Sequence, residues 1–370
     1  MKYVVVFCMG YPPYPGGIER YSAEIAAAYR RQGRRVLVIT KSSTLPAFSL
    51  INRIPVFSVN GSNQLTIFFK MCIVWAKLKK RVSCDFIHAT TWRLALPAKI
   101  LPSQSPLVVS VHGLEVLKVP KYLKFIQYFI LKKADVVVGV SETALKCAKQ
   151  GLPAAEGKWL SSYNGLTYAD ESIPYCLEGK FREAVKRPII IYTFCRLVER
   201  KNVQGAIKAI AILKRKGVNG FKYKIAGGGP MLNSLKELAK NEDVLDVIEF
   251  LGFIDESDVV NEYKQADIFL HPQIMTDNGL DIEGFGITIA DAMSFGAAPI
   301  VGVAGGPNDF IMHEITGLKV DGGNVLEIAN AIERLITSID TRNTISNNAY
   351  NWSLANLSWT KHISSILAVL

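Results

Sequence analysis

The sequence has few cysteines and no long apolar run, and each shortage excludes a class of protein. Its six cysteines show no Cys-x-x-Cys pair and no regular spacing, so a disulfide framework is not indicated and a reducing, cytosolic environment is expected. No run of about eighteen uncharged apolar residues is present, which argues against a membrane-spanning helix. The apolar run that follows Lys2 and ends at Met9 is short and leads into Pro-Pro-Tyr-Pro-Gly-Gly, so we interpret it as a buried strand rather than a signal peptide.

Size and apolar content indicate more than one folded core. At about 150 residues per domain, 370 residues predict two domains. The hydrophobic content of 49% is ample for two cores.

Positive charge is concentrated in the N-terminal half. Residues 1–180 contain 24 Lys and Arg against 10 Asp and Glu, whereas residues 181–370 contain 19 against 22. This surplus predicts an acidic partner for the N-terminal half. A nucleic acid is one alternative. Against it, the basic residues accompany aliphatic helices rather than an exposed aromatic platform.

One basic cluster is interleaved with aromatic residues. The lysines between residues 118 and 133 alternate with Tyr122, Phe125, Tyr128 and Phe129, a pattern typical of an amphipathic helix with a basic rim. Such a helix either packs on the core with a solvated lysine edge or lies on an anionic membrane. Four or five lysines at about 1 kcal/mol each would suffice for reversible attachment.

Apolar runs alternate with helical patterns in the manner of doubly wound α/β domains. A helix with apolar residues at helical spacing is expected from Ile18 to Tyr29, ended by Gly33. Strands are predicted at residues 4–7, 36–39, 107–111, 136–140, 189–193, 223–226, 248–251, 268–271 and 300–303.

A polar segment broken by Pro174 predicts the domain boundary. It places an N-terminal domain at residues 1–165, a linker at 166–187 and a C-terminal domain from residue 188. Ligands of open α/β sheets bind at the carboxyl ends of the strands, so these ends are where site residues are expected.

The segment from Asp281 to Met293 is the most informative stretch of the chain. Gly284 and Gly286 allow a close backbone approach to a ligand, and a helix beginning near Ile287 presents free N–H groups and a positive dipole end. Glu283 precedes these glycines, and Asp291 lies one helical turn past Ile287. Two acceptor carboxylates around a phosphate-binding helix start suit a polyhydroxylated ligand. Surface acids that complement the helix dipole are the simpler alternative.

Three further polar side chains follow predicted strands. Arg196 and Lys201 come after the strand at residues 189–193, with Asn202 as the expected N-cap of the next helix. His112 directly follows the strand at residues 107–111. Taken alone, each could be a solvated cation or a hydrogen-bonded structural histidine.

The glycine run at residues 227–229 permits a dinucleotide-binding interpretation, which is weak. Leu232 stands where a third small residue is required for close helix packing.

These motifs, in this order, resemble the retaining glycosyltransferases of family 4, and the resemblance covers nearly the whole chain. It rests on Glu283-Gly-Phe-Gly286 with an acid eight residues later, and on further segments at residues 12–19, 111–113, 140–142, 164–165, 196–201, 226–230, 250–252, 266–272 and 296–301. The resemblance implies a GT-B fold. In that fold two Rossmann-like domains face each other across a cleft, and a C-terminal helix crosses back to the first domain. In this chain the second domain is expected to end at residue 345, and residues 346–370 are expected to form the returning helix.

The resemblance also assigns roles to individual residues. Glu283 would contact the donor sugar's hydroxyls and Asp291 the ribose, while Arg196 and Lys201 would neutralise the diphosphate. His112 would lie beside the donor sugar near the reacting carbon. Backbone contacts to the sugar, the diphosphate and the base are implied for Gly16, Gly17, Gly252, Phe253, Ile254, Gly284, Phe285, Gly286 and Ile287.

The sequence departs from the family pattern at three positions. Asp291 stands where Glu is usual, which puts the ribose contact in doubt. Cys195 and Asn202 replace glycines beside the two bases, so the backbone there could approach the ligand differently.

The implied reaction is transfer of a hexose from a nucleotide-sugar, with retention and without a metal or other cofactor. No Asp-x-Asp triplet occurs, as expected of GT-B enzymes. The form of residues 279–286 resembles mannose-transferring members and favours GDP-mannose, with UDP-sugars as the alternative. For the basic N-terminal half, the hypothesis is that it binds a lipid-linked or membrane-surface glycan acceptor. The enzyme would then act in polysaccharide or glycolipid synthesis at the cytoplasmic face of the membrane. A sugar-nucleotide epimerase of the same architecture would need a second acid and base set, which we do not find.

Overall fold

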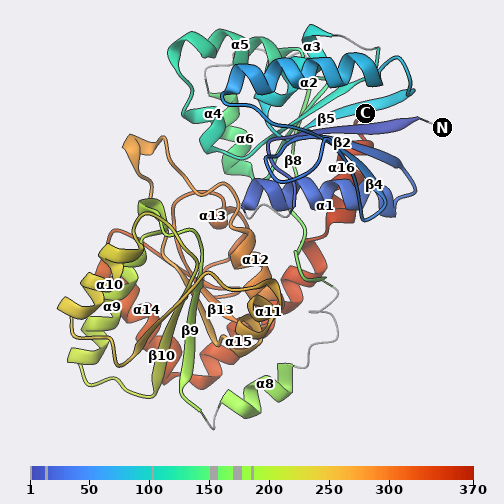
Figure 1. The fold of residues 1–370 in the computed structure, drawn as a ribbon. Helices are drawn as coiled ribbons and strands as arrows, with labels where there is room; N and C mark the ends of the chain where they lie inside the picture. Colours follow the sequence, from blue (N-terminus) through green and yellow to red (C-terminus); the bar gives the residue numbers. More distant parts are fainter. Residues whose placement is uncertain (1, 13–15, 102–103, 151–156, 170–176, 185–186) are drawn as a thin grey trace. The chain divides into compact units, whose positions relative to one another are not determined.

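The computed structural model describes residues 2–12, 16–101, 104–150, 157–169, 177–184 and 187–370 (Figure 1). The chain forms two compact units, Met1–Gly165 with Ser358–Leu370, and Leu166–Leu357. Each unit is built on a largely parallel sheet with helices on both faces. The predicted α/β class with two doubly wound domains is therefore confirmed.

The sheet of the first unit has eight strands over the described residues, in the order β3-β4-β2-β1-β5-β6-β7-β8. All neighbouring strands are parallel except β3 and β4, which form an antiparallel hairpin at one edge. The strands are β1 (Tyr3–Cys8), β2 (Arg35–Lys41), β3 (Phe48–Ile51), β4 (Ile54–Val59), β5 (Cys84–Ala89), β6 (Leu107–Val111), β7 (Val136–Gly139) and β8 (Lys158–Ser161). All four strands predicted for this half are present.

Two helical layers cover this sheet. Val5 and Phe7 of β1 share one core cluster with residues of α2 (Gln64–Leu78), α3 (Leu96–Ile100) and α5 (Lys121–Lys132). The opposite face is covered by α1 (Gly17–Arg31) together with the C-terminal α16 (Trp359–Leu367) (Figure 1). Shorter elements are η1 (Trp92–Ala95), α4 (Leu114–Leu117) and α6 (Glu142–Lys149).

A buried polar chain fastens α16 to the first unit. The Tyr21 hydroxyl on α1 lies 2.7 Å from Ser110 Oγ and 3.0 Å from His362 Nε2 on α16. His88 Nε2 lies 2.7 Å from the same Ser110 hydroxyl. The end of the chain thus packs within the first unit, as the predicted GT-B organisation requires.

The sheet of the second unit has six strands over the described residues, in the order β11-β10-β9-β12-β13-β14, and all pairs are parallel. They are β9 (Ile189–Phe194), β10 (Phe221–Ala226), β11 (Ile248–Gly252), β12 (Ile268–His271), β13 (Ala298–Gly302) and β14 (Leu318–Val320). The five strands predicted for this half are confirmed. Because all strands are parallel, the loops that follow them meet at one edge.

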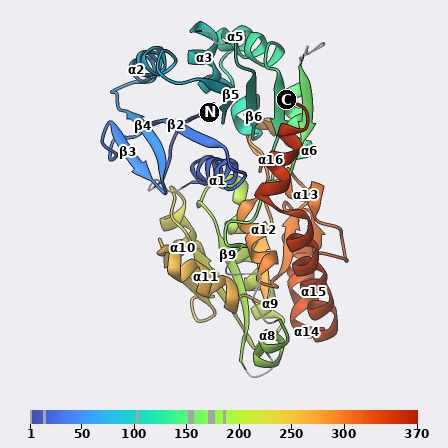
Figure 2. The same cartoon turned by 90° about the vertical axis from the view of Figure 1, so that its right-hand side faces the viewer.

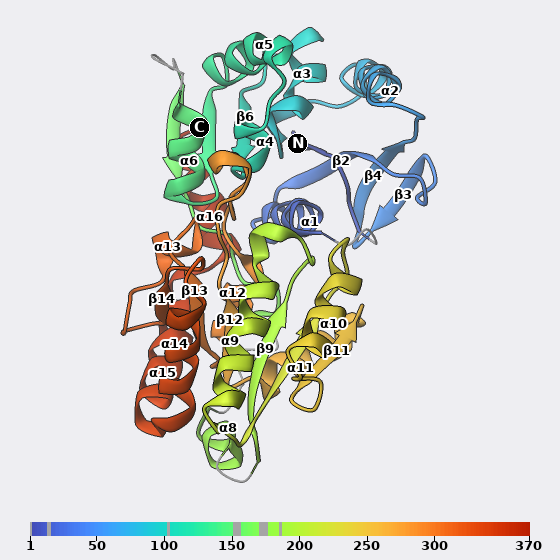
Figure 3. The same ribbon diagram turned by 90° about the vertical axis from the view of Figure 1, so that its left-hand side faces the viewer.

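Helices cover both faces of this second sheet. On one face, α9 (Val203–Arg215) lies between α10 (Leu232–Asn241) and α14 (Val325–Thr337) (Figure 3). On the other face, Tyr263 of α11 (Glu256–Gln265) stacks on Phe295, which follows α12 (Ile287–Ser294). The long α15 (Ile339–Asn356) packs against α12 and runs beside α14 (Figure 2).

Two predicted boundaries differ from the observed elements. The predicted start of the returning segment, residue 346, falls inside α15, whose packing on α12 and β13 keeps it in the second unit until Ser358. The predicted linker contains the helix α8 (Leu177–Ala184). Residues 170–176 and 185–186 of that linker lie outside the described residues.

Candidate functional site

An ion pair between Lys201 and Glu283 is the centre of the candidate site in the second unit. Lys201 ends the short helix η2 (Glu199–Lys201) after β9, and Glu283 lies in the loop after β12. Lys201 Nζ donates a hydrogen bond to Glu283 Oε2 and lies 3.3 Å from His271 Nε2. Both charged side chains are buried. Residues 82 positions apart in the sequence therefore meet at the carboxyl edge of the sheet.

The electrostatics of this pair fix its protonation state. Burial opposes ionisation of Glu283, but the charges of Lys201, His271 and Arg200 outweigh burial and lower the pKa of this carboxyl to about 2. Burial, and then the neighbouring Lys201, lower the pKa of His271 to about 4. At neutral pH the site thus holds a carboxylate and a neutral imidazole.

A glutamine orients the imidazole. His271 Nδ1 lies 3.0 Å from Gln273 Oε1, and Gln273 Nε2 donates to the carbonyls of Gly302 and Ala304 at 2.7 and 2.9 Å. Since the amide oxygen only accepts, Nδ1 carries the imidazole proton and Nε2 faces Lys201 as an acceptor. The loops after β12 and β13 are thereby fastened together.

Arg200 adds a second positive charge that the sequence did not single out. Its guanidinium lies 3.7 Å from Glu283 Oε2 and 3.4 Å from Asp281 Oδ1. The signal was present as a basic residue next to Lys201. Nothing in the sequence separated it from a solvated neighbour. His271 and Gln273 were also missed, although His271 ends a predicted strand.

The loop after Glu283 leads into the start of α12. Gly286 is the N-cap with φ of +86°, a conformation that L-residues rarely adopt, and no side chain caps the helix. Phe285 is buried against Phe310, with ring centroids 4.9 Å apart. Phe285 is therefore a packing anchor. The start of α12 has no side-chain cap, and the predicted backbone contacts of residues 284–287 to a ligand stay predictions.

Arg196 lies beside the glycine run at the end of β9. Its side chain is exposed and forms no ion pair with a described residue. A Cβ on Gly227 would lie 2.0 Å from the Cys195 carbonyl oxygen, and a Cβ on Gly229 would lie 2.4 Å from that of Leu197. The glycines thus allow two backbone segments to touch, which explains the run without a dinucleotide.

The residues predicted to meet the base also lie at this edge. Gly252 ends β11, and its carbonyl accepts the Gly227 N–H at 2.7 Å. Phe253 is 75% exposed, and Ile254 is half-buried. Phe253 is a large apolar ring in solvent, which suits stacking against a flat ligand.

In the first unit, His112 directly follows β6. Its Nε2 lies 2.9 Å from the Thr90 carbonyl oxygen, and its backbone N–H donates to Glu115 Oε1 at 2.5 Å. Because a carbonyl only accepts, Nε2 carries the proton that is donated to Thr90. The edge of the Tyr21 ring packs on the imidazole at 4.7 Å between centroids. Thr90 and Tyr21 thereby orient the imidazole, while Glu115 holds the backbone N–H of His112.

Gly16 and Gly17 begin α1 in the same unit. Gly16 is its N-cap, and no side chain caps this 15-residue helix. The first N–H groups of α1 are the donors that the sequence predicted there. Residues 13–15 of the same motif lie outside the described residues.

Two family descriptions match consecutive parts of the chain, "Glycosyltransferase Family 4" over residues 15–166 and "Glycosyl transferases group 1" over residues 178–352. The chain belongs to glycosyltransferase family 4.

One relative matches this glycosyltransferase over almost its full length, and another matches part of it. A GDP-mannose-dependent alpha-(1-6)-phosphatidylinositol monomannoside mannosyltransferase of Mycobacterium tuberculosis is 26% identical over 373 residues, covering 97% of this chain and 95% of that one. A GDP-mannose-dependent monoacylated alpha-(1-6)-phosphatidylinositol monomannoside mannosyltransferase of Corynebacterium glutamicum is 34% identical over 143 residues. The match covers 38% of this chain and 36% of the relative.

Solved structures show the same GT-B fold. Sucrose-phosphate synthase from Thermosynechococcus elongatus has a TM-score of 0.82 at 17% identity, covering 100% of this chain and 98% of that chain. Anabaena HepE in complex with UDP and glucose has a TM-score of 0.78 at 19% identity, with all of both chains covered. At these identities the likeness establishes the fold.

The departures from the family pattern have structural explanations in this glycosyltransferase. Asn202 takes φ of +52°, the left-handed conformation that a glycine would adopt. Its side chain accepts from the Gly205 N–H and donates to the carbonyls of Pro272 and Gly322. The asparagine therefore preserves the turn and adds a cap.

Asp291 is buried on α12 and already has a backbone partner. Its Oδ1 accepts the Thr167 N–H at 2.7 Å. The predicted ribose contact stays a prediction, and one oxygen of the shorter carboxylate holds residue 167 in the described structure.

Proposed function

We propose that this glycosyltransferase moves a hexose from a nucleotide-sugar to a lipid-linked glycan acceptor, with retention of the anomeric configuration and without a metal. The observation that carries the donor half of the proposal is the buried Lys201–Glu283 pair beside the uncapped start of α12. A cation, a carboxylate and free N–H groups in one loop cluster are complementary to a diphosphate joined to a polyol.

The proposed chemistry requires two kinds of charge stabilisation. Positive charge grows at the anomeric carbon and negative charge on the departing phosphate. Lys201, Arg196 and the amides at the start of α12 would stabilise the phosphate, and Glu283 would orient the sugar through its hydroxyls. The acceptor hydroxyl would attack from the face that the nucleotide leaves, with the departing phosphate as base. No protein nucleophile is assigned.

Lys201 and Glu283 neutralise each other in the described structure, and this supports a donor-binding role. A phosphate would take over part of the Lys201 charge, while Glu283 would exchange a cation for sugar hydroxyls. Arg200 would continue to balance the carboxylate, since it contacts Glu283 and Asp281 together. When the donor binds, Lys201 would therefore pair with the phosphate and Glu283 with Arg200, so that neither charge is left without a partner.

GDP-mannose is the donor that we propose first, and UDP-sugars come second. The Mycobacterium tuberculosis relative, which matches 97% of this chain, is described as GDP-mannose-dependent, and this agrees with the form of residues 279–286. Because the structural neighbour Anabaena HepE was solved in complex with UDP and glucose, UDP-sugars are the alternative donors. The predicted roles of His112, Gly16 and Gly17 in the first unit remain predictions.

The acceptor half of the proposal rests on α5. Tyr122, Phe125 and Phe129 are 79%, 77% and 48% exposed on one face of this helix, and Lys121 and Lys124 form no ion pair with a described residue. Apolar rings flanked by uncompensated lysines suit an anionic bilayer surface. Among the described helices, none has the length and apolarity to cross a membrane.

We further propose that attachment is peripheral and on the cytoplasmic face. Cys8, Cys72, Cys84, Cys147 and Cys195 are free thiols, which fits a reducing compartment. The full-length mycobacterial relative is described as acting on a phosphatidylinositol mannoside, a membrane glycolipid.

Product analysis tests the proposed function. The purified protein is incubated with GDP-mannose, UDP-glucose or UDP-galactose, with and without a phosphatidylinositol mannoside, in EDTA. NMR then reads the configuration of the new linkage. We expect an α-linked product from an α-configured donor only when acceptor is present. Inversion, a requirement for added metal, or an epimerised nucleotide-sugar without acceptor would each contradict part of the proposal.

A further inference from the structure

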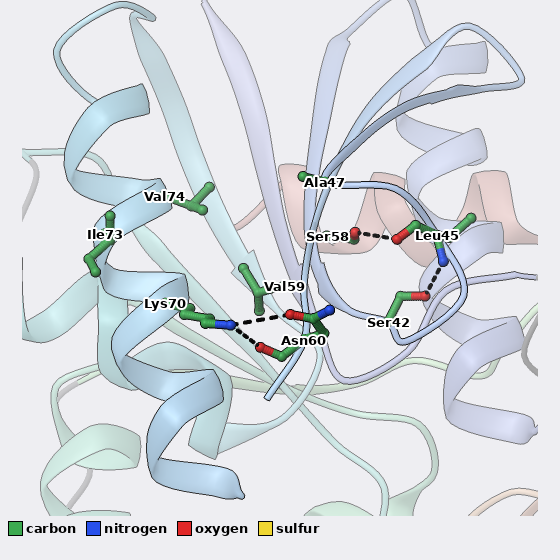
Figure 4. Close-up of a pocket in the computed structure, with 9 residues that line it drawn as sticks. All are labelled: Ser42, Leu45, Ala47, Ser58, Val59, Asn60, Lys70, Ile73 and Val74. Atoms are coloured by element: carbon green, nitrogen blue, oxygen red, sulfur yellow. Dashed lines mark hydrogen bonds between the residues drawn. The ribbon is translucent and has the colours of Figure 1, made fainter. Parts of the chain in front are cut away.

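A pocket of about 260 Å³ lies at the carboxyl edge of the first unit's sheet (Figure 4). It is formed by the turn after β2, the end of β4 and one side of α2. The lining residues are Ser42, Leu45, Ala47, Ser58, Val59, Asn60, Lys70, Ile73 and Val74. The volume lies below the roughly 300–1,000 Å³ typical of sites for whole drug-sized ligands, so a nucleotide-sugar would not fit.

Most of the polar groups in this pocket already have partners. Ser42 Oγ accepts the Leu45 N–H at 2.9 Å, and Ser58 Oγ donates to the Pro46 carbonyl at 2.6 Å. These hydroxyls shape the turn at residues 42–47. Leu45, Ala47, Val59, Ile73 and Val74 leave the walls aliphatic.

Lys70 is the single charge in the pocket lining. Its ammonium donates to the Asn60 carbonyl at 2.8 Å and to Asn60 Oδ1 at 3.2 Å. An ammonium has three N–H donors, so one remains for a ligand. None of the lining residues is acidic, and Lys70 forms no ion pair with a described residue. The positive charge beside aliphatic walls is therefore uncompensated and suits an anion.

The outer face of α2 continues the aliphatic wall. Leu65, Phe69 and Ile73, four residues apart, are 69%, 61% and 54% exposed. Ile73 belongs both to this stripe and to the pocket. The buried residues Met71 and Trp75 of α2 join Ile130 of α5 in one core cluster, so both helices cover the same sheet face. The exposed rings of α5 therefore belong to the same helical layer.

The pocket shares an edge of the sheet with His112. β2, which precedes the pocket, and β6, which precedes His112, are three strands apart in the order β2-β1-β5-β6. At about 4.8 Å per strand, this separation is about 14 Å. A ligand held in the pocket by one end could present a sugar, some distance along its length, near His112.

We propose that this pocket binds the phosphate of the lipid acceptor at Lys70, with the adjoining aliphatic chain along Ile73 and the outer face of α2. The inference deepens the proposed function and rests on it for the identification of the ligand as an acceptor. The recognised chemistry is a phosphate ester that carries an alkyl chain.

Octyl phosphate, used below its micellar concentration, is the probe for calorimetric titration. Octyl glucoside supplies the chain without the charge, and inorganic phosphate supplies the charge without the chain. We expect octyl phosphate to bind at least tenfold more tightly than either, because both halves of the pocket are engaged. Inorganic phosphate binding as tightly as octyl phosphate would reduce the pocket to an anion site and overturn the proposal.

Three variants locate the binding. Lys70→Met removes the charge and keeps the aliphatic stem, and Ala47→Phe fills the pocket from the exposed turn. Each should weaken octyl phosphate at least tenfold, as loss of a charged hydrogen bond or of the binding space predicts. Lys77→Gln, an exposed lysine two turns along α2 and outside the pocket, is the matched control and should bind like the unaltered protein. Equal weakening by Lys77→Gln would contradict the proposal.

A donor assay separates this inference from the proposed function. Thermal unfolding with and without GDP-mannose and UDP-glucose reports on the second unit and confirms that each variant is folded. Lys70→Met and Ala47→Phe should keep the stabilisation by the donor. If donors stabilise the protein but octyl phosphate does not bind, the pocket inference alone fails. If octyl phosphate binds but no donor stabilises the protein, the pocket stands as a lipid-phosphate site and the proposed function fails.

Discussion

Two clusters of basic residues, one in each unit, differ in whether acidic side chains compensate them. In the second unit, Lys201 and Arg200 are compensated by Glu283 and Asp281 within the site. In the first unit, Lys70, Lys121 and Lys124 have no acidic partner among the described residues and stand beside exposed apolar side chains.

This difference indicates two kinds of ligand. Buried charges without a partner are costly, so a site that is empty between turnovers benefits from internal compensation. Exposed cations carry no such cost and can remain uncompensated until they meet an anionic surface. The second unit therefore has the features of a site for a soluble, charged donor, and the first unit those of a surface for an anionic lipid.

The largest effect is expected from Glu283→Gln. The change replaces the carboxylate proposed to orient the sugar with a neutral amide, which still accepts hydrogen bonds but no longer balances the charge of Lys201. The activation free energy of turnover should rise by about 2–4 kcal/mol, which lowers the rate roughly 30- to 1,000-fold. Single-turnover measurements with the preferred donor test this. Glu199→Gln, an exposed acid in the neighbouring η2, is the control. A Glu283→Gln enzyme of near wild-type rate would remove Glu283 from the proposed role.

Asn202 provides a test of how the second unit holds its cationic loop. Asn202→Ala removes the helix cap and places an alanine in the left-handed conformation, where its Cβ is strained. Each effect costs about 1 kcal/mol, so the free energy of unfolding of this unit should fall by about 2 kcal/mol. Asn202→Gly adopts the same φ without strain and should lose less. Chemical denaturation of the two variants gives the comparison. Equal losses would show that φ at position 202 does not matter.

Acid should affect the two units unequally. Burial lowers the pKa of His88 to about 3 and, for His362 and His271, to about 4. The unfolded chain binds these protons near pH 6.5, whereas the folded protein does not. Stability present above pH 6.5 is therefore lost as the pH falls toward 4, by up to about 1.4 kcal/mol per pH unit for each histidine.

Two of these histidines, His88 and His362, lie in the first unit and one in the second. Calorimetric scans between pH 7 and 5 should show the transition of the first unit moving further. In the second unit, Glu283 adds a loss only between about pH 4.5 and 2, because its folded pKa is depressed. A larger shift of the second unit's transition than of the first unit's between pH 7 and 5 would contradict this assignment.

The smallest effect per residue is expected at the membrane. Lys121→Gln with Lys124→Gln should weaken sedimentation with anionic vesicles by about 1 kcal/mol per lysine, or roughly fivefold each. The matched control is Lys208→Gln with Lys222→Gln, two exposed lysines of the second unit. Binding should disappear at high salt, because screening shortens the range of these charges. Sedimentation that is equal at low and high salt would exclude an electrostatic contribution.

The sequence predicted nine of the fourteen strands in the described residues, those whose apolar runs are continuous. It missed β3, β4, β5, β8 and β14, which are short or interrupted by polar residues. It also placed Lys201 and His112 after strands and Glu283 just before the start of a helix, and the structure has all three in those places. Arg200 could not be predicted, because a basic residue beside Lys201 has no pattern that distinguishes a site residue from a solvated one. Its contact with Asp281 depends on a loop 81 positions away along the chain.

Helix α2 shows why the sequence alone does not predict an exposed apolar surface. It is apolar on nearly all sides, and Ile67, Met71 and Trp75 face the core while Leu65 and Phe69 face solvent. Periodicity alone cannot show which of two apolar faces is buried. The basic rim of α5 was visible in the sequence because charged residues separate its two faces.

The contact between the glycine run and the end of β9 has a consequence for engineering. Any side chain at Gly227 or Gly229 would collide with a carbonyl oxygen of Cys195 or Leu197. Substitutions there would force apart the two backbone segments beneath Arg196. Libraries meant to change nucleotide preference should therefore keep both glycines fixed and diversify Phe253, whose ring stands in open solvent on an adjacent loop.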